Sequence, residues 1–201
     1  MEEKQHRFAH ILSETAGLVN STTEAEAILG KIAENVAGAF NAKGSSIMLL
    51  SPDRKLLLYT AAYGLTDKYV RKGPVAADRS MAAALEDQPV AVSHATEDER
   101  VQYPEEAREE GILSILSVPI TLGQEAVVGV LRVYMPTPYV FNNDDIYFVA
   151  GVANLSAVAL DNARQFGGVR RDYASLAQEL IEWRAALGTE WLAGQTASRR
   201  A

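Results

Sequence analysis

The sequence has no cysteine among its 201 residues. This absence excludes disulfide bonds, thiolate-bound zinc, iron–sulfur clusters, a cysteine nucleophile and any cofactor held through a thioether. Basic residues are also in the minority, with 19 Lys and Arg against 26 Asp and Glu, so the formal net charge is −7. An acidic chain disfavours nucleic-acid binding, because affinity for phosphates depends on clustered Lys and Arg.

Long hydrophobic runs are missing as well. No stretch reaches 18 uninterrupted apolar residues, and residues 1–6 (MEEKQH) lack the apolar core of a signal peptide. We therefore expect a cytoplasmic protein without a membrane partner. Apolar residues make up 48% and charged residues 22% of the chain, which is the composition of a folded globular protein.

Helical patterns occur at both ends of the chain. Apolar residues recur at helical spacing over residues 3–19, and a capping box formed by Thr23 and Glu26 begins a second helix that extends to Phe40. Further helices are predicted at residues 80–86, 104–110, 143–166 and 169–187. Asn142 or Asn143 can cap the third of these, and two aspartates suit its positive N-terminal end.

Strand patterns fill the middle of the chain. Strands are predicted at residues 45–51, 55–63, 90–92, 112–121 and 126–134. The first two flank a turn at residues 51–54, and the last two flank Gly123. Helices, strands and helices in this order predict an α+β fold with an antiparallel sheet, because βα units do not alternate.

The segment 111–163 resembles the second half of a GAF domain. The matching residues are GILSILSVPI (111–120), VGVL (128–131), Phe141 with Asp144 and Asp145, and the helix 149–163. The first half agrees more loosely, with Asp98-Glu99-Arg100 where this family often carries Asp-x-Arg. The resemblance implies a GAF-like, PAS-related central antiparallel sheet with helices on both faces, and a small-molecule pocket under the variable middle segment.

The resemblance also implies a non-catalytic sensor. Covalent attachment of a tetrapyrrole and reduction of free methionine sulfoxide, which some relatives perform, both need cysteines that this chain lacks. Cyclic-nucleotide binders carry an Asn-Lys pair that is also missing. We therefore expect an unidentified small-molecule ligand, no enzymatic activity, no cofactor and no metal.

One predicted group of ligand-binding residues is polar. His94, Asp98 and Arg100 would form the rim of the pocket, with the planar guanidinium facing an anionic ligand. The alternative is that the aspartate pairs with the arginine and the histidine lies on the surface. Arg79 and Ser80 lie at a helix start, where they would hold an anion or simply cap the helix.

The other predicted ligand-binding residues lie on strands. They would form the floor of the pocket, although about half of them would be ordinary core: Met48, Tyr63, Ser114, Leu116, Arg132 and Tyr134. Strand alternation places Ser114 and Leu116 on the same face. The pattern does not identify which face of the sheet carries the pocket.

A heptad pattern in residues 169–187 predicts a dimer interface. Its apolar positions are spaced 4, 3, 4, 3 and 4 residues apart and include Leu176, Leu180, Trp183 and Leu187. We predict a homodimer in which the N-terminal helix joins the same bundle, although packing on the chain's own domain fits the spacing too. The predicted divisions are an N-terminal helix (1–22), the GAF domain (23–165), a coiled-coil-like helix (166–188) and a flexible tail (189–201).

Three functions are consistent with these features. In the first, a ligand in the pocket shifts the dimeric helices between two arrangements, and a signalling protein in trans reads the change. In the second, the pocket is filled by side chains and the domain is a ligand-free dimerisation scaffold. In the third, the protein senses haem or a diatomic gas with His94 as the iron ligand.

Overall fold

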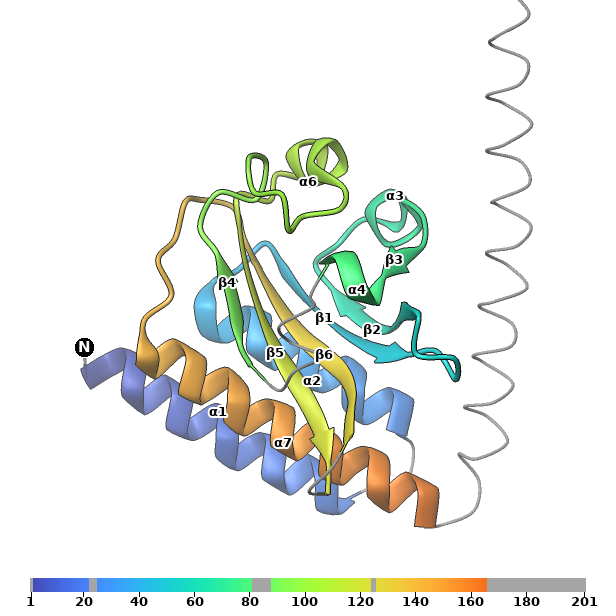
Figure 1. Ribbon diagram of the computed structural model, residues 1–201. Coiled ribbons are helices and arrows are strands. Elements are labelled where there is room, and N and C mark those ends of the chain that lie inside the picture. The colour runs from blue at the N-terminus through green and yellow to red at the C-terminus, as the bar shows by residue number, and fades with distance from the viewer. Residues whose placement is uncertain (1, 22–24, 81–87, 124–125, 166–201) are drawn as a thin grey trace, which may run out of the picture.

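A six-stranded antiparallel sheet forms the centre of the molecule (Figure 1). The computed structural model describes residues 2–21, 25–80, 88–123 and 126–165. The strand order is β3-β2-β1-β6-β5-β4. The strands are β1 (Gly44–Leu50), β2 (Leu56–Tyr63), β3 (Val75–Ala76), β4 (Val90–Val92), β5 (Ser114–Leu122) and β6 (Ala126–Met135). The predicted α+β fold and its five predicted strands are confirmed.

The central strands approach one another closely at Gly129 of β6. A Cβ atom at this position would lie 2.3 Å from the carbonyl oxygen of Met48 on β1. The glycine therefore permits β1 and β6 to pair without a side-chain clash. This close pairing sets the register in which Ser46 of β1 lies opposite Arg132 of β6.

Three long helices cover one face of the sheet (Figure 1). They are α1 (Glu2–Ser21), α2 (Ala25–Phe40) and α7 (Asn143–Gln165). Phe8 stacks on Phe148 with ring centroids 4.0 Å apart, and Phe40 lies 5.3 Å from Phe8. These rings join the three helices to one another, and alternate residues of β5 and β6 complete this apolar core.

Helix α1 packs on the core of its own domain, and its place in a dimer bundle stays a prediction. Its apolar residues Phe8, Ile11 and Val19 are buried in the core of its own domain. The helix therefore needs no partner subunit to cover its apolar stripe. Val149 and Ala153 of α7 are buried in the same core.

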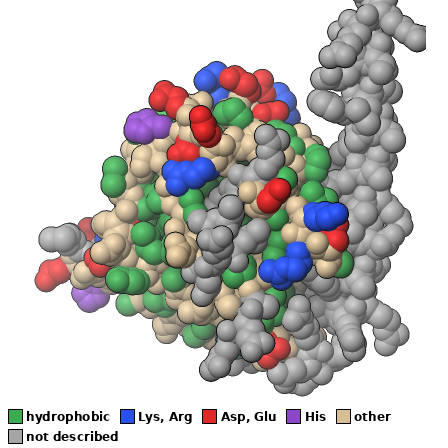
Figure 2. All heavy atoms as spheres, in the orientation of Figure 1, with side chains coloured by type: hydrophobic (Ala, Val, Ile, Leu, Met, Phe, Trp, Pro, Cys, Tyr) green, Lys and Arg blue, Asp and Glu red, His purple; other side chains and the backbone are tan. Residues whose placement is uncertain are grey.

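Short helices and loops cover the other face of the sheet. They include α3 (Asp67–Val70), α4 (Ala77–Ser80) and α6 (Pro104–Glu110). Thr66 caps α3 by accepting a hydrogen bond from the backbone of Tyr69. Glu110 joins α6 to this loop by accepting hydrogen bonds from Thr66. Charged side chains gather at this end of the molecule (Figure 2).

Helix α7 passes the length and hydropathy criteria for a membrane span over Asn143–Ala163. Its apolar character has a structural cause in this fold, because one side of the helix packs on β5 and contacts α1 and α2. The predicted helix at residues 80–86 falls largely outside the described residues. The predicted helix 166–188, the predicted tail 189–201 and the interface residues Leu176, Leu180, Trp183 and Leu187 fall wholly outside them.

Candidate functional site

A cavity lies on the face of the sheet that the short helices cover. Its volume is about 20 Å³, enough for about one water molecule. Strands β4, β5 and β6 supply its floor, and the loops after α3 and before α6 supply its walls. The lining residues are Tyr69, Lys72, Val75, Val90, Val92, Arg100, Val101, Gln102, Tyr103, Ile115, Ser117 and Arg132.

A row of polar side chains crosses the floor of this cavity. Arg132 of β6 lies directly opposite Ser117 of β5 on one side and Ser46 of β1 on the other. Opposed residues on neighbouring strands have their side chains on the same face and within about 5 Å of each other. All three residues are buried, with Arg132 only 5% exposed. A buried guanidinium is therefore held beside two hydroxyl groups.

The two hydroxyl groups of this row differ in their hydrogen bonds. Ser46 Oγ shares a 2.9 Å hydrogen bond with the hydroxyl of Tyr134. Ser117 Oγ is fully buried and has no hydrogen-bond partner among the described residues. A buried polar group without a partner costs about 1–3 kcal/mol, so such groups call for an explanation. Ser117 lines the cavity, and a molecule bound there would supply the missing partner.

Lys72 forms a wall of the cavity together with tyrosines. Its ammonium lies 3.6 Å from the ring centroid of Tyr69 and 4.8 Å from that of Tyr59. It also donates a 2.7 Å hydrogen bond to the Tyr59 hydroxyl. Burial raises the pKa of both tyrosines above the ordinary value. Both phenols therefore stay protonated, and the positive charge of the wall is not cancelled by a phenolate.

Two other polar wall residues are engaged in structural hydrogen bonds. The side chain of Gln102 accepts from the backbone N–H of Ala76 and donates to the carbonyl of Pro74. Tyr103 donates its hydroxyl to the same carbonyl at 2.6 Å. These bonds fix the loop before α6 against the segment after α3. The wall is therefore held in place by groups that do not need a ligand.

Arg100 lies at the cavity but is paired with Asp98. Its Nε and Nη2 atoms donate to the two carboxylate oxygens at 2.8 and 2.6 Å. These hydrogen bonds from Arg100 lower the pKa of Asp98 below its ordinary value. The geometry matches the alternative in which the two residues pair with each other. His94 is exposed and does not line the cavity.

The predicted floor residues divide between the two faces of the sheet. Arg132 lines the cavity, and Met48 lies on the same side of the sheet in the adjoining buried cluster. Ser114 and Leu116, also predicted at the pocket, do not line this cavity. Leu116 packs in the helix-covered core, and Ser114 donates its hydroxyl to the carbonyls of Ser93 and Thr137.

Four other predicted residues have different outcomes. Tyr63 is 46% exposed at the end of β2 and does not line this cavity. Arg79 and Ser80 belong to α4, and their side chains are outside the described part of the structure. Their role at the pocket stays a prediction. Tyr134 is fully buried on the cavity side, where its hydroxyl holds Ser46.

Sequence reasoning missed Ser117 and Lys72. Ser117 lies between Leu116 and Val118 in the strand. Because successive side chains point to opposite faces, Ser117 lies on the face opposite these two residues. A serine within a nearly continuous apolar strand was the available signal. Lys72 gave no such signal, because its position depends on how α3 and the following loop fold over the sheet. Among the described residues, no group of three metal-ligating side chains comes together.

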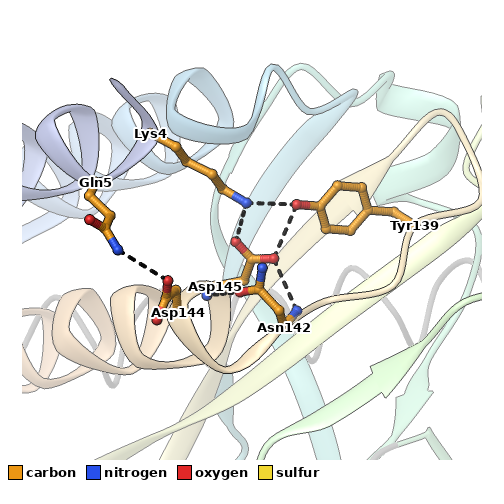
Figure 3. A network of polar contacts seen from close by, with 6 residues as sticks. All are labelled: Lys4, Gln5, Tyr139, Asn142, Asp144 and Asp145. Carbon is orange, nitrogen blue, oxygen red and sulfur yellow. Dashed lines mark hydrogen bonds and ion pairs between the residues drawn. The ribbon is translucent and has the colours of Figure 1, made fainter. Parts of the chain in front are cut away.

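A second buried polar group joins α1 to the start of α7 (Figure 3). The Lys4 ammonium lies 2.5 Å from the carboxylate of Asp145 and donates to the Tyr139 hydroxyl at 2.8 Å. Burial lowers the pKa of Lys4, but these two partners raise it more, and the net shift is upward. Asn142 and Asp145 form reciprocal hydrogen bonds that cap α7. The hydrogen bonds of the cap and the ion pair with Lys4 compensate the cost of burying the Asp145 carboxylate.

The comparisons with known proteins agree with this architecture. The sequence model described as "GAF domain" matches residues 22–161. The chain belongs to the GAF domain family. No curated protein matches the chain. GAF domains are generally regulatory or sensor domains that bind small molecules, and the predicted GAF fold is confirmed.

Solved GAF structures show the same fold at low sequence identity. The GAF domain of a phosphoenolpyruvate-protein phosphotransferase from Coxiella burnetii is 20% identical, with a TM-score of 0.71, covering 81% of this chain and 97% of that one. The corresponding Acinetobacter domain is 23% identical, with a TM-score of 0.67, covering 84% and 99%. A free methionine-R-sulfoxide reductase from Neisseria meningitidis, in complex with its substrate, is 16% identical, with a TM-score of 0.65, covering 79% and 90%.

Proposed function

We propose that this chain is a non-catalytic sensor that binds a small molecule in the cavity on the sheet. The observation that carries this proposal is the buried Ser117 hydroxyl beside Arg132, because this hydroxyl has no hydrogen-bond partner in the part of the chain that the structure describes. Natural proteins rarely keep such a group buried without a partner. Catalysis is not proposed, because the cysteines on which the reductase chemistry of the family depends are absent.

Strand β5 connects the cavity to the long helices. Ser117 faces the cavity, while its neighbours Leu116 and Val118 pack in the core beneath α7. A ligand that moves β5 changes the surface on which α7 rests. A shift in the balance of two arrangements requires that the ligand bind them with different affinities. We propose that α7 passes this shift to residues 166–188.

The proposed output is a homodimer whose arrangement a cytoplasmic partner protein reads in trans. The support for it is the heptad pattern that includes Leu180 and Trp183. Leu180→Asp would place a charge in that apolar interface. The variant is expected to sediment as a monomer in analytical ultracentrifugation while keeping the far-UV spectrum of the wild type. A dimeric variant would contradict the assignment of this interface.

Native mass spectrometry of the freshly purified protein tests ligand binding directly. The native mass is compared with the mass after denaturation. We expect a dimer that carries additional mass, and this mass should disappear when the protein unfolds. A native mass equal to the chain masses alone, together with no thermal shift from a metabolite library, would instead favour the ligand-free scaffold.

The haem hypothesis has no structural support at His94. The side chain is exposed and lies outside the cavity, whereas an iron ligand in a haem site needs a pocket that holds the ring beside it. Addition of haem to the purified protein tests whether His94 binds iron. We expect the absorption spectrum of free haem, and a Soret band that depends on His94 would instead support the haem hypothesis.

A further inference from the structure

We infer that residues 66–76 and 101–110 form one cover that opens over the cavity, and that Lys72 is the latch that holds this cover against the sheet. The inference deepens the proposed sensor function, on which its meaning for ligand binding rests. The cavity has a volume of about 20 Å³, which is room for about one water molecule. A larger molecule therefore needs a wall that moves, and both segments of the cover supply wall residues.

The two segments of the cover contact each other in antiparallel order. Their helices α3 and α6 lie on the same side of the sheet (Figure 1) and are in contact. Thr66, at the start of the first segment, donates its backbone N–H and its hydroxyl to Glu110, at the end of the second. Lys68 follows in the first segment and donates to Glu109 at 2.6 Å. The start of one segment is therefore joined to the end of the other.

The opposite ends of the two segments are joined as well. The Gln102 side chain accepts from the backbone of Ala76 at 2.8 Å and donates to the carbonyl of Pro74 at 2.9 Å. A Cβ atom at Gly73, where φ is +139°, would lie 2.7 Å from the hydroxyl oxygen of Tyr103. Glycine therefore permits the two segments to approach closely at this point. Because the segments are joined at both ends, opening moves them as one body.

Lys72 attaches the middle of the cover to the sheet. Its Nζ atom donates a 2.7 Å hydrogen bond to the hydroxyl of Tyr59 on β2 and lies 4.8 Å from the centroid of that ring. Within the cover, the same atom donates to the carbonyl of Tyr69 at 3.0 Å and lies 3.6 Å from its ring centroid. Tyr69 in turn packs edge-on against Tyr134 of β6. A hydrogen bond from a charged group is stronger than a neutral one, and the cation–π contacts add to it.

The ends of the cover have attachments of their own. Val75 and Ala76 of β3 pair with β2, and Lys43, which precedes β1, lies 3.1 Å from the carboxylate of Glu110. These contacts do not involve Lys72. When the Lys72 ammonium leaves Tyr59, the middle of the cover is therefore released from β2 while its ends stay attached and serve as pivots.

Because the sequence has no cysteine, an introduced thiol can report the opening of the cover in the full-length chain. Ser117→Cys and Met48→Cys each place one thiol on the cavity face, on β5 and β1, where both native side chains are buried. Ser45→Cys places a thiol on the helix-covered face, where Ser45 is buried against α2. The rate at which each thiol reacts with an aromatic disulfide reagent measures how often its surroundings open. Each rate is measured with and without Lys72→Met.

Lys72→Met keeps a long unbranched side chain and removes the ammonium. We expect the reaction rates of both cavity-face thiols to rise by the same factor, at least about tenfold, because a hydrogen bond from a charged group is lost. Tyr59→Phe removes the acceptor hydroxyl on β2 but keeps the ring, and should raise both rates about fivefold. The rate of the Ser45→Cys thiol should not change in either case.

Lys68→Met is the matched control. Lys68 also donates its ammonium across the cover, to Glu109, but these side chains are 77% and 60% exposed. The pair joins the two segments to each other and does not reach the sheet. Because exposed ion pairs contribute little, the rates of all three thiols should stay within about twofold of their values without this substitution.

Three results with Lys72→Met would overturn the inference. A rise at only one of the two cavity-face thiols would show that the segments open separately. No rise at either of them would show that Lys72 is not the latch. A rise at all three thiols would mean that Lys72 stabilises the whole fold. The thiols report opening without a ligand, so the latch can fail here while native mass spectrometry supports the sensor function, and the sensor function can fail there while the latch stands.

Discussion

The two faces of the sheet are both buried, but different kinds of side chain cover them. On the helix-covered face, Leu116 and Leu131 belong to the apolar core that also contains three phenylalanine rings from α1, α2 and α7. On the cavity face, the next residues along the same strands are Ser117 and Arg132. On each of these two strands, one residue therefore lies in the apolar core and the next lies on the polar cavity face.

Because of this difference, we expect one face to determine the stability of the fold and the other to determine ligand binding. The helix-covered face buries apolar surface, which is the main favourable contribution to folding. The cavity face buries the Arg132 guanidinium and a Ser117 hydroxyl that has no hydrogen-bond partner among the described residues. Burying polar groups opposes folding to the extent that partners do not compensate them. We expect substitutions on the first face to change the free energy of unfolding, and those on the second to change ligand binding.

The largest effect is expected at the junction of the three helices. Phe148→Ala removes a ring that stacks on Phe8 and is 3% exposed. The free energy of unfolding should fall by about 3–4 kcal/mol, the usual cost of a buried Phe truncation. Urea denaturation measures it. Tyr147→Ala is the neighbouring control, since this side chain is 72% exposed and should change stability by less than about 0.5 kcal/mol. Similar losses in both variants would contradict the packing.

A smaller loss is expected at the polar contact between α1 and α7. Lys4→Met removes the charge partner of fully buried Asp145. The carboxylate keeps its hydrogen bonds from Asn142 and Tyr139, so we expect a loss of about 2 kcal/mol. Hydrogen exchange should also show faster opening of α1. Lys31→Met is the control, because Lys31 forms an exposed pair with Glu34; equal effects would show that the burial of Asp145 does not matter.

Two buried serines give a direct comparison of the faces. Ser45 Oγ donates to the carbonyl of Ala33 in α2 at 2.5 Å, whereas Ser117 Oγ has no partner within the described residue ranges. Ser45→Ala should cost about 1 kcal/mol, and Ser117→Ala should be neutral or stabilise the ligand-free protein by up to about 1 kcal/mol. Thermal unfolding of both variants decides the signs. A clear loss of stability in ligand-free Ser117→Ala would mean that its hydroxyl has a partner.

The smallest expected effect is a pH dependence at the rim of the cavity face. Burial raises the pKa of Glu110, but hydrogen bonds from Thr66 and Lys43 outweigh this and hold it below the ordinary value of 4.5. Because the folded-state pKa is depressed, Glu110 stabilises the fold above about pH 4.5, and this contribution is lost as pH falls through the lower folded-state pKa.

Glu110→Gln isolates this contribution. The difference in unfolding free energy between the wild type and this variant should shrink between about pH 5 and pH 3. Glu105→Gln is the control, since Glu105 is exposed and pairs with Arg108 within α6. A difference that stays constant with pH would show that Glu110 ionises normally in the folded protein.

The sequence by itself determined the elements and the family. Helical spacing over residues 3–19 and β-branched runs in 112–121 and 126–134 produce the predicted helix and strands, because local periodicity reports which positions are buried. The order of these elements restricts the topology. The choice of Arg132 as a floor residue also agrees with the cavity lining, since a cation within an apolar strand is unusual.

Only the tertiary structure decided which strand face carries the cavity. Alternation groups Ser114 with Leu116 and separates them from Ser117, yet both faces of β5 are buried and the burial pattern along the strand is continuous. No local signal then distinguishes the face beneath α7 from the face beneath the loops. The same holds for α1, whose apolar stripe fits a partner helix or its own domain equally well. The choice depends on contacts between residues distant in the chain, such as Phe8 with Phe148, and these exist only once the helices pack.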